Sequence, residues 1–379
     1  QRRLSAWGID EKALRDWNDR VAVRVLTPGS NAGEALHLLS ALEKRSPLWD
    51  TDLESARSTL SAAISLILRL VGRDPDPTKS CDHVFLSLLA ERRLRAGGTA
   101  ELRCLLEDVK SPPVEEIGAL PINDFISKKD RKTLGASLNA LLSSLTFATW
   151  RQGTALDVGE WLSVKNGKTP AVIVSVAHLD DEERSLVLGV LFEEVLTWMR
   201  GLPGSQRLKA LVVFDEVYGF IPPHPANPPT KRPLVALMKQ ARAFGVGVIL
   251  ATQNPMDLDY RALSNAGYWC VGRLQTDADR ERVIDGLVAS ADREESQDLG
   301  KLVQKLGPMF FLLRDVHDGG RHVILQPRWA MSLLRGPMTR AELQQARAVY
   351  EKMTASEPRL GNDGEGCARG AAVGPDNGE

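Results

Sequence analysis

The sequence predicts an α/β fold with a mainly parallel sheet, and three observations lead to this prediction. From about residue 171 onward, apolar segments of strand length alternate with amphipathic helical segments. Ala171–Ala177 and Val246–Thr252 are apolar almost throughout, which is typical of strands buried on both faces of a parallel sheet. Polar side chains directly follow two of the predicted strands, at the ends where open α/β sheets bind ligands.

The first part of the chain is expected to hold one strand of this sheet and a large helical region. Val21–Thr27 is the predicted strand, and Pro28-Gly29 ends it. Apolar residues then recur at helical spacing over about residues 52–71, and again from Leu134 onward. We therefore expect residues 1–30 to begin the core and residues 31–165 to form a mainly helical insertion.

The core is expected to continue over residues 166–335 as strands and helices in alternation, joined by right-handed crossovers. The predicted segments are the strand Ala171–Ala177, the helix Asp181–Arg200, the strand Ala210–Phe214, a helix around Leu234–Ala241, the strands Val246–Thr252 and Tyr268–Leu274, and a helix over about residues 277–287.

The last part of the chain is expected to add a hairpin, a helix and a tail. Met309–Arg314 and His322–Gln326 are predicted strands, joined by a turn at Asp318-Gly319-Gly320. Within residues 336–355, Thr339 followed by Glu342 predicts a capping box at the start of a helix. Residues 356–379 are rich in Gly, Asp, Asn and Ala, and we expect them to be disordered.

Composition narrows the classes of function. The 379 residues are 43% hydrophobic and 26% charged, and no apolar run is long enough to predict a membrane span. The net charge is −1, so a surface that binds nucleic acid would have to be local. The four cysteines form no metal-binding or CxxC spacing, which favours a reduced, cytoplasmic setting.

Two adjacent carboxylates are the strongest sign of chemistry. The apolar strand Leu211–Phe214 leads directly into Asp215 and Glu216. In nucleotide hydrolases, a carboxylate at this position holds Mg²⁺ and a second one polarises the attacking water. A strand that ends in a solvated acidic turn would look the same, so these residues leave both interpretations open.

A polar amide at the end of the next strand favours an active site. Val246–Thr252 is followed by Gln253, Asn254 and Pro255. A glutamine at this position can contact a terminal phosphate or the attacking water. The alternative is a simple turn ahead of the proline.

These motifs also resemble a known family. Lys239–Gly247 and Ala251–Pro255 are similar to the HerA/FtsK superfamily of hexameric, ATP-driven DNA motors, and most similar to a bacterial group of HerA-domain ATP-binding proteins. The resemblance spans roughly residues 7–353. It includes Ala177–Leu179, Leu263–Gly267, Gly272–Thr276 and Arg328–Pro337.

The resemblance implies a RecA-like ATPase core that uses ATP and Mg²⁺. It places Asp215 at the position of the magnesium-associated carboxylate, Glu216 at that of the catalytic base and Gln253 at that of the polar sensor. Arg242 matches a basic residue that stabilises charge in the transition state. Arg273 and Arg280 are rival candidates for that role, and the alternative for Arg242 is a solvated arginine on an amphipathic helix.

One motif of such ATPases is missing from the sequence. A P-loop needs Gly-x-x-x-x-Gly-Lys-Ser/Thr, follows a strand and opens a helix. Gly167-Lys168-Thr169 lacks the first glycine, because position 162 is Leu, and it precedes a predicted strand. We interpret Asn166-Gly167 as a turn. We expect the P-loop to lie before Gln1, and the chain as given to be inactive alone.

The resemblance further implies a homo-oligomeric ring, expected to be a hexamer, around double-stranded DNA, and it allows for a nuclease partner. Lys231 and Arg232 are the candidates for DNA contact, because they follow the acidic pair through the Pro-rich loop Ile221–Pro233. The loop could couple hydrolysis to a channel, or it could be a rigid connector. The alternatives to a DNA translocase are an ATP-dependent protein-remodelling or secretion motor and a non-catalytic assembly module.

Overall fold

The computed structural model describes residues 10–43, 45–144, 147–253, 255, 258–274, 276–287, 293–316, 321–327 and 338–354. It confirms an α/β fold in which parallel pairing dominates the core. A four-stranded parallel sheet has the order β5-β2-β1-β6. Its strands are β1 (Val21–Pro28), β2 (Glu34–His37), β5 (Thr154–Ala155) and β6 (Thr169–Val174).

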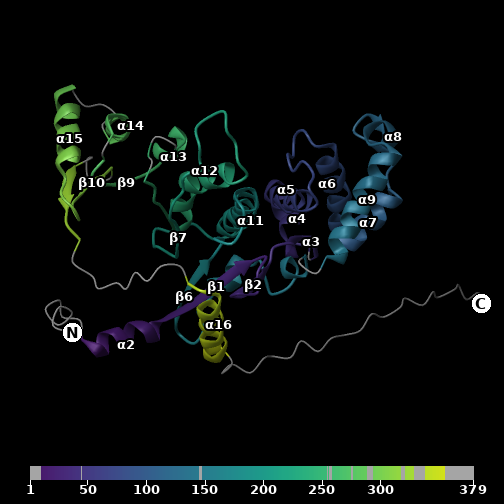
Figure 1. Ribbon diagram of the computed structural model, residues 1–379, viewed down its shortest axis with the longest axis horizontal. Coiled ribbons are helices and arrows are strands. Elements are labelled where there is room, and N and C mark those ends of the chain that lie inside the picture. Colours follow the sequence, from purple (N-terminus) through teal and green to yellow (C-terminus); the bar gives the residue numbers. More distant parts are fainter. Residues whose placement is uncertain are drawn as a thin grey trace, which may run out of the picture.

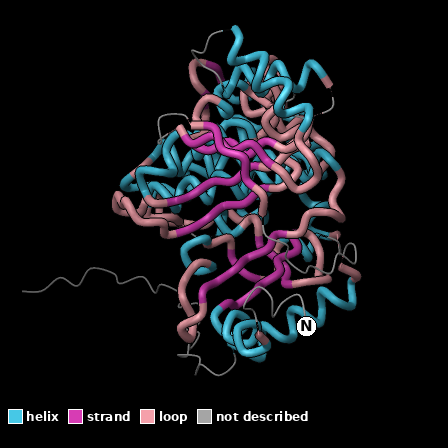
Figure 2. The backbone as a smooth tube through the Cα atoms, turned by 90° about the vertical axis from the view of Figure 1, so that its left-hand side faces the viewer, coloured by secondary structure: helices cyan, strands magenta, loops and turns pink. Residues whose placement is uncertain are grey.

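A second parallel pair carries the predicted acidic and amide residues. β7 (Ala210–Phe214) pairs with β8 (Val246–Leu250), with Ala210 opposite Val246 and Phe214 opposite Leu250. The sequence predicts one open sheet, whereas these two strands form a sheet of their own beside the four-stranded one. Figure 2 shows the strands near the middle of the molecule, with helices above and below them.

The late strands form a third sheet. β9 (Tyr268–Val271) and β11 (His322–Leu325) both pair antiparallel with β10 (Phe311–Asp315). Together with α14 (Asp277–Leu287) and α15 (Arg293–Lys305) they enclose a small hydrophobic core of their own. The hairpin between β10 and β11 is confirmed. The predicted turn at Asp318-Gly319-Gly320, the tail 356–379 and the similar segment Arg328–Pro337 lie outside the described residues.

Helices from the predicted insertion and from the core share one large hydrophobic cluster. α5 (Leu53–Leu70) packs along α11 (Asp181–Arg200). Figure 1 shows both helices above the strands β1, β2 and β6. The other helices with eight or more residues are α2 (Glu11–Arg20), α6 (Cys81–Arg95), α7 (Leu102–Lys110), α9 (Lys128–Ser143), α12 (Lys231–Gln240) and α16 (Arg340–Thr354).

Short elements make up the rest of the secondary structure in the described residues. They are the helices α3 (Ser40–Glu43), α4 (Leu48–Thr51), α8 (Ile122–Phe125), α10 (Val158–Trp161) and α13 (Tyr260–Leu263), the 3-10 helices η1 (Phe147–Trp150) and η2 (Ala241–Phe244), and the hairpin of β3 (Glu116–Ile117) and β4 (Leu120–Pro121). Within the described part of the chain, we find no helix whose length and hydropathy would let it span a lipid bilayer.

β2 and β5 were not expected from the sequence. Both lie inside residues 31–165, yet β2 pairs with β1 and β5 pairs with β2. A buried ion pair joins the three strands, because Arg24 on β1 binds Glu34 on β2 and also donates to the Thr154 hydroxyl on β5 at 2.6 Å. The segment expected to be helical therefore also contributes two strands to the sheet.

Candidate active site

The ends of β7 and β8 are held together by backbone hydrogen bonds beyond the strands themselves. The Ala251 N–H donates to the Phe214 carbonyl at 3.0 Å, and the Val217 N–H donates to the Ala251 carbonyl at 2.9 Å. Val217 is fully buried directly after the acidic pair. These contacts fix the position of the two residues between Phe214 and Val217, which are Asp215 and Glu216.

Phe214, the last residue of β7, packs against two other aromatic rings. Its ring lies 5.3 Å from the ring of Phe192 on α11 and 5.2 Å from that of Phe220, measured between centroids. Aromatic pairs at this separation stabilise a contact beyond the area they bury. The acidic pair therefore follows a strand whose last residue is packed on two sides.

Asp215 and Glu216 are both exposed at the C-terminal end of β7. One Asp215 carboxylate oxygen accepts a hydrogen bond from the Glu216 N–H at 3.0 Å. Glu216 has a φ of 54°, in the left-handed region that few non-glycine residues adopt. Backbone strain of this kind is concentrated at functional sites, where the surrounding structure holds it in place.

Gln253 meets Glu216 across the two strands. Gln253 follows the end of β8, and its Nε2 donates a hydrogen bond to Glu216 Oε1. The expected convergence of the acidic pair and the amide is therefore present, on adjacent parallel strands and at the same edge of the sheet. Asn254 lies outside the described residues.

The chemistry of this strand end fits a magnesium nucleotide. Mg²⁺ prefers oxygen ligands and is usually held by one or two carboxylates together with phosphates and water. Asp215 Oδ1 accepts the backbone N–H, and Oδ2 has no partner in the described part of the chain. Asp215 therefore keeps one carboxylate oxygen that an ion or a water molecule can reach.

Arg242 is not brought to this cluster. It is an exposed residue of η2, directly before β8, whereas Gln253 comes after that strand. A strand of 5 residues is roughly 15 Å long. Arg242 and the pair of Glu216 and Gln253 therefore lie at opposite ends of β8.

The rival arginines differ in accessibility. Arg280 is buried on α14, where it donates to the Leu274 carbonyl at 3.1 Å and pairs with Asp277. Arg273 is exposed just after β9. Arg280 therefore has a local structural contact, and Arg273 is the more accessible of the two.

Lys231 lies inside the protein. It is 4% exposed, and its Nζ lies 2.9 Å from a carboxylate oxygen of Asp259, which is also buried. The same Nζ donates to the Ala226 carbonyl at 3.0 Å and so ties down the Pro-rich loop. An ammonium group in this position is not accessible to a DNA phosphate.

Arg232 is half-exposed and also has a partner. Its guanidinium lies 2.7 Å from a carboxylate oxygen of Glu193, a buried residue of α11. Burial raises the pKa of Glu193, and the charge of Arg232 opposes that rise. Arg232 therefore compensates a buried acid, and 51% of its side chain stays exposed.

The Gly-Lys-Thr tripeptide is a turn and not a phosphate loop. Asn166 and Gly167 both have positive φ angles, of 51° and 69°, and Lys165 and Lys168 bridge across them. The chain then enters β6, so no helix follows the tripeptide. Two consecutive left-handed residues are typical of a tight hairpin turn.

An exposed apolar face beside the site was missed in the sequence. Leu211 and Val213 on β7 are 51% and 62% exposed, and Ile249 on β8 is 48% exposed. These side chains share one face of the pair, and the opposite face packs against the main core. Parallel sheets normally have both faces covered, so this face is unusual. Leu211, Val213 and Asp215 occupy every second position of the sequence. This spacing is a sequence sign that the apolar face and the first acidic residue lie on the same side of β7.

The scan against protein-family models and the search of curated proteins gave no match. Among solved structures, the genome packaging NTPase B204 of Sulfolobus turreted icosahedral virus 2 with ATP-gammaS is 17% identical, covers 47% of this chain and 74% of that chain, and has a TM-score of 0.33.

The bacterial conjugative coupling protein TrwB is also similar. Its unbound form is 15% identical over 86% of this chain and 81% of that chain, with a TM-score of 0.46. Its complex with an ATP analogue is 14% identical over 83% and 76%, with a TM-score of 0.48. Likenesses of this strength assign neither an activity nor a partner to the chain.

Proposed function

We propose that the chain is a RecA-like, HerA/FtsK-type ATPase that moves along or remodels double-stranded DNA as a homo-oligomeric ring. The observation that supports this proposal most directly is the contact between Gln253 and Glu216, next to Asp215, at one end of two parallel strands. A carboxylate for the ion, a carboxylate for water and a polar amide are among the groups that catalyse phosphoryl transfer to water.

In the proposed reaction each residue has one task. Asp215 would hold a magnesium ion, and the ion would supply positive charge next to the phosphates. Glu216 accepts a proton from water while the water oxygen bonds to the terminal phosphorus and the bond from that phosphorus to the bridging oxygen breaks, releasing ADP and phosphate. Gln253 orients the Glu216 carboxylate, or the water itself.

The proposed site needs two further groups beside these three residues. One is a phosphate-binding element next to Asp215, and such an element would cover the exposed face of Leu211, Val213 and Ile249. Because Arg242 lies at the other end of β8 from Glu216, its proposed contact with the transition state needs a second copy of the chain. Arg232 remains a candidate for DNA contact.

DNA dependence of ATP hydrolysis by the natural protein tests the function. We expect double-stranded DNA to raise the hydrolysis rate, and Glu216→Gln to abolish the stimulated rate while DNA binding is kept. Hydrolysis that no DNA stimulates would favour a protein-remodelling or secretion motor. Absence of any hydrolysis in the natural protein would contradict an ATPase and leave an assembly module.

A further inference from the structure

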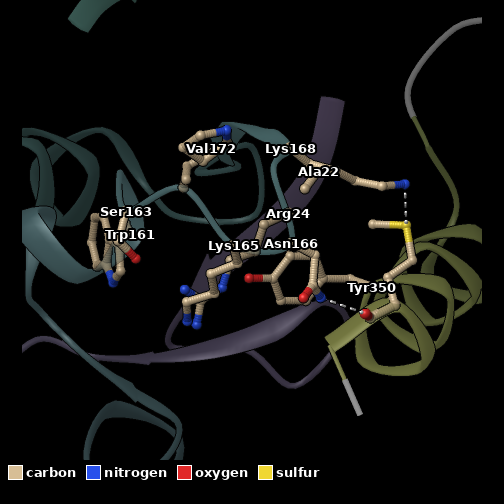
Figure 3. Close-up of a pocket in the computed structure, with 11 residues that line it drawn as sticks. Ala22, Arg24, Trp161, Ser163, Lys165, Asn166, Lys168, Val172 and Tyr350 are labelled. Carbon is tan, nitrogen blue, oxygen red and sulfur yellow. Dashed lines mark hydrogen bonds between the residues drawn. The ribbon is translucent and has the colours of Figure 1, made fainter. Parts of the chain in front are cut away.

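A pocket of about 240 Å³ lies between α16 and the first residues of β1 and β6 (Figure 3). Much of its wall is apolar, with the rings of Trp161 and Tyr350 and the side chain of Val172 among the lining groups. The pocket lies where β1 and β6 begin, whereas Asp215 follows the last residue of β7. It therefore shares no residue with the candidate active site.

Three cationic side chains line this pocket, and two of them are neutralised by carboxylates. Arg24 binds Glu34 through two hydrogen bonds, of 2.6 and 2.5 Å. Lys165 Nζ lies 2.9 Å from a carboxylate oxygen of Glu160. Each pair joins one cation to one carboxylate, so neither pair leaves a net charge in the pocket.

Lys168 differs from the other two cations. Its Nζ has the Met353 sulfur at 3.8 Å as its partner, and it has no carboxylate partner in the described ranges of the chain. A thioether sulfur is only a weak acceptor. The pocket therefore carries one uncompensated positive charge, on a half-buried side chain next to apolar walls.

The polar groups near Lys168 are positioned by the backbone and by α16. Asn166 occupies the left-handed turn before Lys168, and its amide nitrogen reaches the Met353 carbonyl at 3.5 Å. The Tyr350 ring lies over the Arg24 guanidinium at 5.4 Å, and this cation–π contact fixes the orientation of the ring. The pocket thus combines the cationic group of Lys168 with the flat rings of Trp161 and Tyr350.

We propose that this pocket binds a small aromatic carboxylate. The carboxylate would pair with Lys168 in place of the weak sulfur contact, and the Asn166 amide would donate a second hydrogen bond. The aromatic body would lie against Trp161, Val172 and Tyr350. One uncompensated positive charge matches a monoanion, and the volume is below the roughly 300–1,000 Å³ of pockets that hold drug-sized ligands.

Benzoate is the probe for this site, and calorimetric titration of the full chain is the measurement. We expect saturable binding of benzoate, and binding at least about tenfold weaker for benzamide, which lacks the charge, and for inorganic phosphate, which lacks the ring. Lys168→Met should weaken benzoate binding about tenfold or more, because a hydrogen bond to a charged group is lost.

Two further variants make the test specific. Lys301→Met removes an exposed lysine of α15 and should leave benzoate binding unchanged. Ser163→Phe adds a ring at an exposed position of the pocket wall and should block the site. Thermal unfolding checks that each variant is folded. Absence of saturable benzoate binding, equal binding of phosphate, or binding unaffected by Lys168→Met would overturn the proposal.

Discussion

Glu216 combines an unusual backbone with a functional contact. Its left-handed φ turns the chain sharply between Asp215 and the buried Val217. The carboxylate of Glu216 then meets the Gln253 amide. A left-handed conformation costs roughly 1–2 kcal/mol in a residue other than glycine. The contacts between the ends of β7 and β8 offset that cost.

Glu194 on α11 gives a prediction on pH and stability. Burial raises its pKa to about 7, and the nearby charge of Asp157 adds to the rise. Between pH of about 4.5 and 7 the folded protein holds a proton that the unfolded chain has lost, so the free energy of unfolding falls as the pH rises through that window. At 1.36 kcal/mol per unit, the loss is at most about 3 kcal/mol.

Replacing this acid by its neutral amide should remove the effect. We expect Glu194→Gln to raise the free energy of unfolding at pH 8 by up to about 3 kcal/mol and to leave it nearly unchanged at pH 4. Urea unfolding at the two pH values measures the difference. Glu107→Gln, at an exposed position of α7, is the matched control. Equal effects of Glu194→Gln at both pH values would contradict a raised pKa.

At the scale of elements, the entry into β8 depends on one glycine. Gly245 ends η2 with a φ of 76°, and a Cβ there would lie 2.3 Å from the Arg207 carbonyl oxygen. At Gly72, φ is 70° and a Cβ would meet nothing within 4 Å. The two glycines therefore separate the cost of the left-handed backbone from the cost of a clash.

Alanine substitutions measure these two costs. We expect Gly72→Ala to lower the free energy of unfolding by about 1 kcal/mol, and Gly245→Ala to lower it by about 3 kcal/mol or more, because the clash adds to the backbone cost. Chemical denaturation of both variants provides the comparison. Equal losses would mean that the backbone from Arg207 can move away from β8 at little cost.

Lys231 and Asp259 give a prediction for the Pro-rich loop. Removing one partner of a buried ion pair leaves an uncompensated charge and typically costs 3–5 kcal/mol, so Lys231→Met should destabilise the fold by about that amount. The double variant Lys231→Met with Asp259→Leu should recover most of the loss. Denaturation and DNA binding are measured together, with the exposed Lys128→Met as control. Unchanged stability with weakened DNA binding would show that Lys231 acts on DNA instead.

Several elements were predicted well because local signals define them. The bounds of β7, α11 and α14 agree with the prediction, and the capping box is confirmed, since the Thr339 N–H donates to a Glu342 carboxylate oxygen at 2.8 Å. β2 and β5 were missed because they are short and depend on pairing with β1. The burial of Lys231 could not be predicted, because its partner Asp259 lies much further along the chain.

At the scale of the whole molecule, the sequence predicts the class of fold better than the arrangement of its sheets. Alternation of strand and helix predicts parallel pairing, and the structure has it. The separation of β7 and β8 from the four-stranded sheet, and their exposed face, depend on long-range packing that periodicity does not contain. The candidate site was predictable because polar residues at the ends of adjacent parallel strands meet at one edge.

Separate measurements of nucleotide binding and hydrolysis test whether the strand end that carries Glu216 is the catalytic site. In the natural protein, ATP binding is measured at equilibrium, and hydrolysis of the bound nucleotide is followed in a single turnover with Mg²⁺ present. Glu216→Gln should bind ATP as the wild type does and hydrolyse it at least about 100-fold more slowly, as loss of a general base requires. The exposed Glu54→Gln should match the wild type in both measurements. Hydrolysis by Glu216→Gln at the wild-type rate would contradict the assignment of this strand end as the catalytic site.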